Sequence, residues 1–371
     1  MDSKAKAGLL AATCVCSIIA LILSVVNVKD VLLLPTKYGL VFDAGSTHTS
    51  LYIYRWPADK ENCLFPDKWE HPQDAKVVGA LDLGGASTQI TFQPEVPVED
   101  RNTSVFFRLY GTNYSLYSHS YLCYGQSQAL KMLLAALHQD TLRAQISHPC
   151  YPKGYLETIT VAELYNSPCV RAPSSVRPDV VLRVTGTGDP TTCHMVVRSL
   201  FDFSCGAPGP CGFNGVYQPP VQGHFFAFAG FYHTFSFLNL THKQSPSEVN
   251  TAVVSFCRRN WEELVRSFPQ HLKYLHTYCS MAFYILTLLL DGYKFNKNTW
   301  SNIHFSRQAA NTDIGWTLGF MLNMTNMIPA EALQHVKVHQ PSLWAGAVSF
   351  LVLAIVAGLV SVFLHCFWKT K

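Results

Sequence analysis

Two short segments near the start of the chain have residue types that suit the binding of phosphate and a metal ion. The first is Asp43-Ala44-Gly45-Ser46-Thr47-His48-Thr49, and the second is Asp82-Leu83-Gly84-Gly85-Ala86-Ser87-Thr88. In each, the glycines let backbone N–H groups approach an anion, the hydroxyls add donors, and the leading carboxylate can hold a hydrated divalent cation. This chemistry predicts a site for a metal-bound nucleotide.

Apolar runs with strand character flank both segments. Tyr38 to Phe42 and Leu51 to Tyr54 surround the first, and Val77 to Leu81 and Ile90 to Phe92 surround the second. We therefore expect two strand-loop-strand hairpins. A single Asp-x-Gly-Ser turn is more often an ordinary hairpin turn, but two matching hairpins favour phosphate binding.

Composition indicates a folded protein with a substantial core. The chain has 371 residues, of which 49% are hydrophobic and 14% are charged, and this excludes a disordered or fibrous protein. The formal net charge is only +4 and the basic residues are scattered, so we expect no nucleic-acid surface.

Long apolar runs at both ends predict two membrane-spanning helices. The runs extend from Gly8 to Val28 and from Leu343 to Trp368, and a span needs about 20 residues. A cleavable signal sequence is the alternative for the first run, but that run is long for this role and lacks a clear cleavage site. Lysines outside both runs place the two tails in the cytosol by the positive-inside rule, so the middle of the chain is expected outside it.

Sequons and cysteines agree with an extracellular middle region. Four Asn-x-Ser/Thr sequons predict glycosylation at Asn102, Asn113, Asn239 and Asn323. Twelve cysteines are present, and eight of them lack Cys-x-x-Cys metal spacing, which favours disulfides over zinc. These eight are Cys123, Cys150, Cys169, Cys193, Cys205, Cys211, Cys257 and Cys279. Cys14, Cys16 and Cys366 fall in the spans, which leaves Cys63 as an odd thiol.

Strands mixed with helices predict an α/β fold class. A further hairpin is expected over Val105 to Tyr117, a helix over Gln126 to His138, and a buried helix over Met281 to Leu290. The Gly186-Thr187-Gly188-Asp189 turn could touch nucleotide or be a structural crossover. Ile314 to Met324 is a helix candidate in which Trp316 is expected to be a core aromatic.

The doubled loops resemble the actin-like ATPase superfamily, in which one turn from each of two lobes closes on the phosphates. Gly79 to Ile90 and Gly315-Trp316-Thr317-Leu318-Gly319 further resemble the ectonucleoside triphosphate diphosphohydrolases, or ecto-apyrases. The resemblance to the cell-surface, two-span branch of that family covers nearly the whole chain. It implies actin-like, ribonuclease H-like lobes between two transmembrane helices, at the plasma membrane.

The family resemblance also implies roles for individual residues. Asp43 and Asp82 would hold Ca²⁺ or Mg²⁺, Gln89 would touch a metal-bound water, and Ser87 would orient the attacking water. The phosphates of a nucleoside tri- or diphosphate would be wrapped by Ser46, Thr47, His48, Gly84, Gly85 and Ala86. Tyr232 and Tyr278 fall where the family has base-stacking aromatics, although core packing is an equal alternative.

The implied disulfides join Cys123 to Cys169, Cys150 to Cys193, Cys205 to Cys211, and Cys257 to Cys279. The implied order of segments is a cytoplasmic tail (1–7), a transmembrane helix (8–28), a remnant of the first lobe (29–76), the second lobe (77–310), a C-terminal ectodomain segment (311–341), a second transmembrane helix (342–368) and a cytoplasmic tail (369–371).

The chain departs from the family between the two loops. Family members carry the rest of the first lobe there, including the glutamate that acts as general base, whereas here only Arg55 to Lys76 separates the hairpins. A packed unit needs at least about 50 residues, so this linker cannot form a lobe. An internal excision near Asn62-Cys63 explains both the short spacing and the odd thiol.

Two hypotheses follow from this departure. The first is an extracellular, metal-dependent nucleotide phosphohydrolase whose activity is impaired because the base is missing; Asp67, Glu70 and Asp74 in the linker are expected to be solvated turn residues and not replacements. The second is a catalytically silent membrane glycoprotein that binds nucleotide weakly or associates with the full-length enzyme. Homo-oligomers through the transmembrane helices and retention in the endoplasmic reticulum are further expectations.

Overall fold

The structure is a computed structural model of the chain. It describes residues 3–25, 29–30, 36–45, 49–57, 77–109, 112–141, 144–174, 177–206, 209–242, 244–309, 312–327, 336–337 and 341–367. The described chain divides into two compact units: residues 1–38, 55–68 and 328–371 belong to the first, and residues 39–54 and 69–327 belong to the second.

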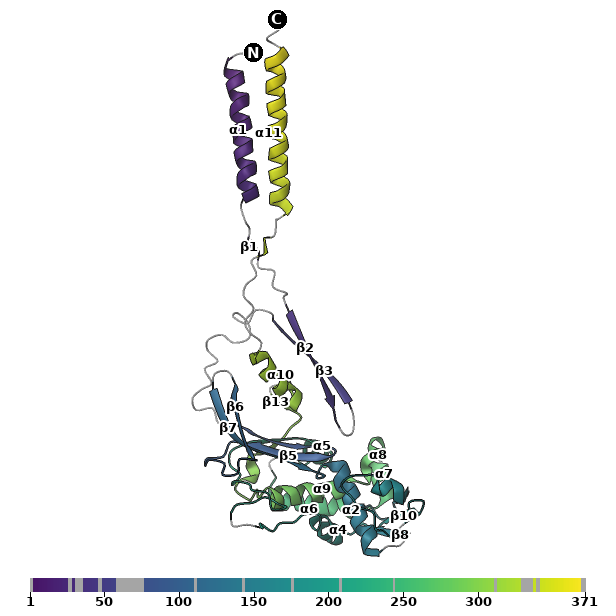
Figure 1. Cartoon of the computed structure of the whole chain (residues 1–371). Helices are drawn as coiled ribbons and strands as arrows, with labels where there is room; N and C mark the ends of the chain where they lie inside the picture. Colours follow the sequence, from purple (N-terminus) through teal and green to yellow (C-terminus); the bar gives the residue numbers. More distant parts are fainter. Residues whose placement is uncertain are drawn as a thin grey trace. The chain divides into compact units, whose positions relative to one another are not determined.

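Two long helices make up most of the first unit. Helix α1 (Ser3–Val25) and helix α11 (Pro341–Phe367) lie side by side in Figure 1. Small side chains allow the close approach, because Ala20 and Ala354 are buried and a Cβ added at Gly346 would touch Leu23. Strands β1 (Lys29–Asp30) and β15 (Val336–Lys337) pair antiparallel.

Only α11 meets the length and hydropathy expected of a membrane span within the described residues. Its apolar stretch, Trp344–Phe363, has 20 residues, whereas the apolar part of α1, Ala11–Leu23, is shorter. Each predicted span therefore contains a helix, and α11 has an apolar stretch long enough to cross a bilayer.

A six-stranded mixed sheet organises the second unit. Its strand order is β12-β11-β4-β5-β7-β6. The strands are β4 (Gly79–Leu83), β5 (Ser87–Phe92), β6 (Ser104–Leu109), β7 (Thr112–Leu122), β11 (Phe225–Ala229) and β12 (Ile303–Phe305). Strand β11 runs parallel to both β4 and β12, and the other pairs are antiparallel.

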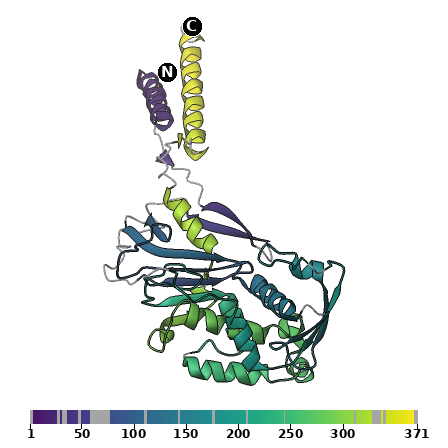
Figure 2. The same cartoon turned by 60° about the horizontal axis from the view of Figure 1, so that its bottom comes forward.

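Alternating burial in these strands places the core. Leu81, Leu83, Ile90 and Phe92 are almost completely buried, as the period of two expected for half-buried strands requires. Helices α5 (Gly230–Phe237), α6 (Pro246–Cys257) and α9 (Tyr278–Thr287) lie together beside this sheet (Figure 2). Every residue from Cys279 to Thr287 is buried, which confirms the expected buried helix.

A three-stranded sheet forms a second, smaller core. Strand β10 (Val181–Gly186) pairs parallel with β8 (Gln145–His148) and antiparallel with β9 (Leu156–Thr160). Helices α2 (Gln126–Thr141) and α3 (Val161–Tyr165) adjoin it, whereas α4 (Pro190–Arg198) packs against α9 and buries Cys193 and Val197 in the main core. The buried residues of this core include Leu134, Ile146, Leu164, Leu182 and Val184.

The remaining strands and α-helices belong to neither of these two sheets. They are the two-stranded hairpin β2 (Thr36–Ala44) and β3 (Thr49–Pro57), the pair β13 (Gln308–Ala309) and β14 (Thr312–Asp313), and helices α7 (Trp261–Ser267), α8 (Leu272–Leu275) and α10 (Trp316–Met327). Both expected phosphate-loop hairpins, the later hairpin β6–β7 and the mixed α/β class are therefore present.

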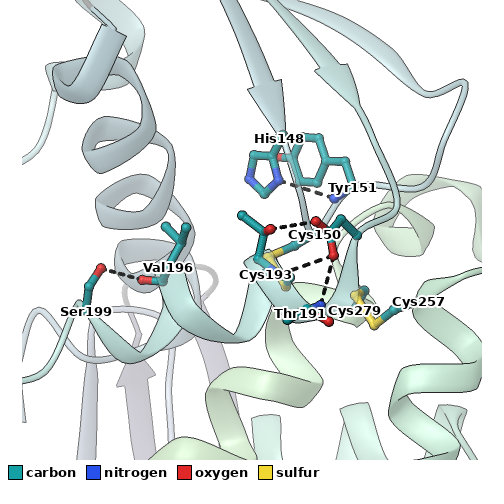
Figure 3. The surroundings of a disulfide bond; sticks show 11 residues. His148, Cys150, Tyr151, Thr191, Cys193, Val196, Ser199, Cys257 and Cys279 are labelled. Atoms are coloured by element: carbon teal, nitrogen blue, oxygen red, sulfur yellow. Dashed lines mark hydrogen bonds between the residues drawn. A yellow bond between two sulfur atoms is a disulfide. The ribbon is translucent and has the colours of Figure 1, made fainter.

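Four disulfides join the pairs that the family resemblance implies. They are Cys123–Cys169, Cys150–Cys193, Cys205–Cys211 and Cys257–Cys279. Figure 3 shows Cys150–Cys193 close to Cys257–Cys279, with the stacked rings of His148 and Tyr151 beside it. Cys14 and Cys16 are free, and Cys63 lies outside the described residues.

The Gly186–Asp189 turn, for which a nucleotide contact and a structural crossover were both open, has structural contacts. Asp189 is the N-cap of α4, and its carboxylate accepts hydrogen bonds from the backbone N–H groups of Thr191 and Thr192 at 3.0 and 3.2 Å. A Cβ at Gly186 would lie 2.1 Å from the backbone oxygen of Pro152. The turn therefore has a structural role, because its glycine packs against the backbone and its helix N-terminus is already capped.

One sequence-based expectation is wrong. Trp316 is 50% exposed and is not a core aromatic. Helix α10 buries its Thr317 side, and the Trp316 ring instead contacts the edge of Phe320 one turn further on the same helix.

Candidate functional site

The second predicted loop is a tight turn between β4 and β5. The backbone N–H of Gly84 donates to the carbonyl of Ser87 at 3.0 Å, and Asp82 lies directly opposite Gln89 in the antiparallel register. The hairpin thus brings the predicted metal ligand Asp82 next to the residue expected to touch a metal-bound water.

Helix α2 begins directly beneath this loop. The N–H groups of Gln126 and Ser127 donate to the carbonyls of Gly84 and Gly85 at 2.8 and 2.9 Å. The first N–H groups of a helix have no partner within it, so the loop caps α2. Because the loop carbonyls point to the helix and the Gly84 N–H closes the turn, the N–H groups of Gly85 and Ala86 are the loop donors suited to face an anion.

Two glycines outside the two predicted loops make this packing possible. A Cβ at Gly125 would lie 2.4 Å from the nitrogen of Ser87 and 2.5 Å from that of Ala86. A Cβ at Gly230 would lie 2.7 Å from the carbonyl oxygen of Leu83. Any larger residue would therefore displace the loop or the end of β4.

Ser87 and Gln89 are joined by a direct hydrogen bond. The Gln89 Nε2 group donates to Ser87 Oγ at 2.7 Å and to Ser120 Oγ at 2.8 Å. This arrangement fixes the amide, and its carbonyl oxygen can then accept from a water. It also fixes the Ser87 oxygen as an acceptor, which leaves the Ser87 hydroxyl hydrogen to point at substrate or water.

A buried polar chain holds the backbone of Asp82. Thr88 Oγ1 donates to the Asp82 carbonyl at 2.8 Å and lies 3.0 Å from the Tyr293 hydroxyl. Gln218 in turn donates to the Tyr293 carbonyl at 2.9 Å. Thr88 and Tyr293 are fully buried, so the chain is rigid and shielded from solvent.

Asp43 and Asp82, one from each hairpin, interact electrostatically. Burial raises the pKa of Asp82 to about 6, and the negative charge of Asp43 adds to the rise. Asp82 is therefore mostly ionised at pH 7, and the repulsion between the two carboxylates would be relieved by a cation. Oxygen ligands suit a hard cation such as Ca²⁺ or Mg²⁺, and a pair of carboxylates leaves room for bound water.

The first hairpin is also tied to the C-terminal motif of the second unit. The hydroxyl of Tyr54 on β3 lies 2.8 Å from Thr317 Oγ1 on α10, and Thr317 is only 3% exposed. The Gly315–Gly319 segment thus helps to position the strand pair that carries Asp43.

Among the described residues, no group of three or more His, Cys, Asp or Glu forms a ready-made metal cluster.

Of the other predicted site residues, the structure describes the two tyrosines but not the three residues of the first loop. Ser46, Thr47 and His48 lie outside the described residues. Tyr232 lies in α5, three residues after the end of β11. The last residue of β11, Ala229, has a positive φ of 52° and pairs with Leu83 beside the loop. Tyr278 stacks on Phe237 with ring centroids 3.6 Å apart, which is a packing role. Base binding by either tyrosine stays a prediction.

The four sequons are all on exposed asparagines: Asn102, Asn113, Asn239 and Asn323. Thr88 lies in the predicted loop but was given no role of its own, and Gly125, Gly230 and Tyr293 were not predicted as site residues. Of these, Gly125 lies directly after the Cys-Tyr segment that starts at Cys123, where a positive φ of 75° at Cys123 turns the chain from β7 into α2.

The fold and site define a mixed α/β protein with two hairpins, each of which carries an aspartate near the end of its first strand. The chain matches the GDA1/CD39 (nucleoside phosphatase) family over residues 34–72 and 64–339. It therefore belongs to this family, whose members are divalent-cation-dependent nucleotidases. Within it, the chain is a member of the ectonucleoside triphosphate diphosphohydrolases, or apyrases.

Relatives and a solved structure agree. The chain is 54% identical to ectonucleoside triphosphate diphosphohydrolase 8 of Gallus gallus over 493 residues, covering 100% of both chains. It is 38% identical to the protein of that name from Mus musculus, covering 97% of both. A crystal structure of nucleoside triphosphate hydrolases from Neospora caninum has a TM-score of 0.50 at 14% identity, covering 92% of this chain and 66% of that chain, which supports the fold.

Proposed function

We propose that this chain is a cell-surface nucleotide phosphohydrolase whose substrates are nucleoside tri- and diphosphates, and that its activity is strongly reduced. The observation that carries the proposal is the turn between β4 and β5, which places Asp82 opposite Gln89 and joins Gln89 to Ser87 by a hydrogen bond of 2.7 Å. A chelated polyphosphate bound between the loops would receive both the cation and the N–H donors that it needs.

The described residues support a division of labour. Asp43 and Asp82 would hold Ca²⁺ or Mg²⁺, which when bound neutralises phosphate charge. Gly84, Gly85 and Ala86, together with the Ser46–His48 segment, would bind the phosphates. Gln89 would hold a metal-bound water, and Ser87, fixed by its hydrogen bond from Gln89, would orient the attacking water.

The reduced activity follows from what lies between the hairpins. The alignment with the Gallus gallus relative has 493 positions and the chain has 371 residues, so 122 positions (493 minus 371) have no residue here. The family match is divided into two stretches that overlap at residues 64–72, which supports a junction near Asn62–Cys63. A segment missing at this junction would remove the glutamate base, and a serine hydroxyl such as Ser87 cannot accept the proton of water effectively at neutral pH.

The test is phosphate release by intact cells that display the chain. With ATP or UTP and Ca²⁺ we expect release close to that of untransfected cells, and Asp82→Asn should lower it no further. Surface biotinylation of the same cells measures how much protein reaches the outside, so that rates are compared per displayed molecule. Rapid release that disappears in Asp82→Asn would contradict the impaired activity.

The proposed topology is two spans with both tails in the cytosol. The side-by-side helices α1 and α11 and the paired strands β1 and β15 support it, because they place the two ends of the ectodomain together. Exposed asparagines at all four sequons support an extracellular, glycosylated middle region. Surface biotinylation distinguishes residence at the plasma membrane from retention in the endoplasmic reticulum. Native electrophoresis tests whether the chain forms homo-oligomers through the helices.

A second candidate function is association with a full-length relative. The first hairpin exposes alternate large apolar side chains: Tyr38, Leu40 and Phe42 on β2 and Leu51 and Ile53 on β3 are 49–67% exposed. Both strands of this two-stranded sheet also have an edge without a neighbouring strand in the described structure. An exposed apolar face of this kind suits a protein partner.

Co-purification tests the association. A tagged copy of the chain, expressed with full-length ectonucleoside triphosphate diphosphohydrolase 8, should retain that enzyme, and Leu40→Ser with Phe42→Ser should reduce its recovery several-fold. Phe106→Ser is the matched control, because Phe106 is 75% exposed on a different strand, β6. Equal recovery with both variants would rule out this hairpin face as the contact.

A further inference from the structure

Two histidines face each other at the sheet edge opposite the phosphate loop. His224 directly precedes β11, and His304 lies in the neighbouring strand β12. The parallel register pairs Phe226 with His304, so His224, two residues before Phe226, lies on the same face of the sheet as His304. His224 Nδ1 is 3.2 Å from His304 Nε2, and the ring centroids are 5.3 Å apart.

We propose that His224 and His304 form a binding site for a transition-metal cation of the Zn²⁺ class. Imidazole nitrogens bind zinc at about 2.0–2.1 Å, and two such bonds at a tetrahedral angle separate the nitrogens by about 3.3 Å. The observed separation is 3.2 Å, which is that of the hydrogen bond between the two rings, so zinc would replace the ring proton that bridges the two nitrogens. Hard cations such as Ca²⁺ prefer oxygen ligands, so the site selects against the cation expected at Asp43 and Asp82.

The position of the pair allows a cation to approach from solvent. His224 is exposed, and His304 also lines a pocket of about 490 Å³ with Phe226, His242 and Ser306. In the part of the chain that the structure describes, no third histidine, cysteine or carboxylate completes a three-residue metal cluster. Beside two imidazoles, water can complete the tetrahedral coordination of zinc.

Bound zinc would cross-link β11 and β12 at the start of the sheet. The His224 carbonyl also accepts a hydrogen bond from Gly79 N–H at 2.8 Å, and Gly79 is the first residue of the strand that carries Asp82. Five residues of strand, about 16 Å, separate His224 from Ala229 beside the phosphate loop. Zinc binding is therefore separate from nucleotide binding and does not depend on the proposed activity.

Calorimetric titration of the full chain in detergent with ZnCl₂, in the presence of excess Ca²⁺, tests the site. His224→Ala and His304→Ala should each weaken zinc binding by about 10- to 100-fold or more. His242→Ala is the matched control, because His242 lines the same pocket without being one of the facing pair, and it should leave zinc affinity unchanged. Asp82→Asn should also leave it unchanged.

Thermal unfolding separates loss of a ligand from loss of structure. Zinc should raise the melting temperature of the unsubstituted chain and not that of His224→Ala, while the two proteins melt together after chelation of all zinc. The proposal is overturned if His224→Ala and His304→Ala bind zinc as tightly as the unsubstituted chain, or if His242→Ala or Asp82→Asn loses as much affinity as they do.

Discussion

Insertion of the missing segment between Asn62 and Cys63 is expected to raise phosphate release from ATP by about 10²- to 10⁴-fold, the usual contribution of a positioned general base. The segment is taken from the Gallus gallus relative, which is 54% identical to this chain and aligns along all of it. The second hairpin is already assembled, since Asp82 lies opposite Gln89 and Gln89 donates to Ser87 at 2.7 Å. Release per displayed molecule is measured as for the short chain.

Two variants of the restored chain identify the cause of the gain. Replacing the inserted base glutamate by glutamine keeps the restored lobe and removes only the proton acceptor, so phosphate release should fall back nearly to the level of the short chain. Asp82→Asn should abolish release through loss of the cation. If the glutamine variant stays fully active, the base is not the missing element, and the added lobe acts through folding or substrate binding instead.

Much of the site could be predicted from the sequence because short-range chemistry determines it. The Asp82–Thr88 turn needs only glycine freedom and strand-forming neighbours, and it lies at the end of β4 as the alternating pattern indicates. The first hairpin likewise follows from its apolar alternation, and its two strands pair as expected.

Long-range contacts account for what the sequence did not indicate. Tyr293 is 205 residues from its hydrogen-bonding partner Thr88, and Gly125 is critical only because the loop packs against it. Trp316 was expected in the core because aromatic residues are usually buried, but burial depends on which side of α10 finds a neighbour. Local pattern does not contain this information.

A disulfide that encloses a longer stretch of chain is expected to contribute more to stability, with a logarithmic dependence on loop length. Removing Cys150–Cys193 with Cys150→Ala and Cys193→Ala should destabilise the second unit by about 4 kcal/mol, because the bond closes a loop of 43 residues. Both sulfurs are in fully buried residues, next to the core that holds His148.

Complete burial lowers the pKa of His148 to about 3, so this histidine is neutral in the folded protein and adds no charge to the core.

Cys205–Cys211 is the matched control, because the same double replacement there opens a loop of only 6 residues and should cost about 2 kcal/mol. Thermal unfolding of the full chain in detergent measures both variants: the melting temperature should fall by about 8–16 °C without Cys150–Cys193 and by about half as much without Cys205–Cys211. Loop entropy and burial act in the same direction here, since Cys205 is exposed while Cys150 and Cys193 are not. An equal or larger fall for the Cys205–Cys211 variant would show that neither loop length nor burial governs the stability of this ectodomain.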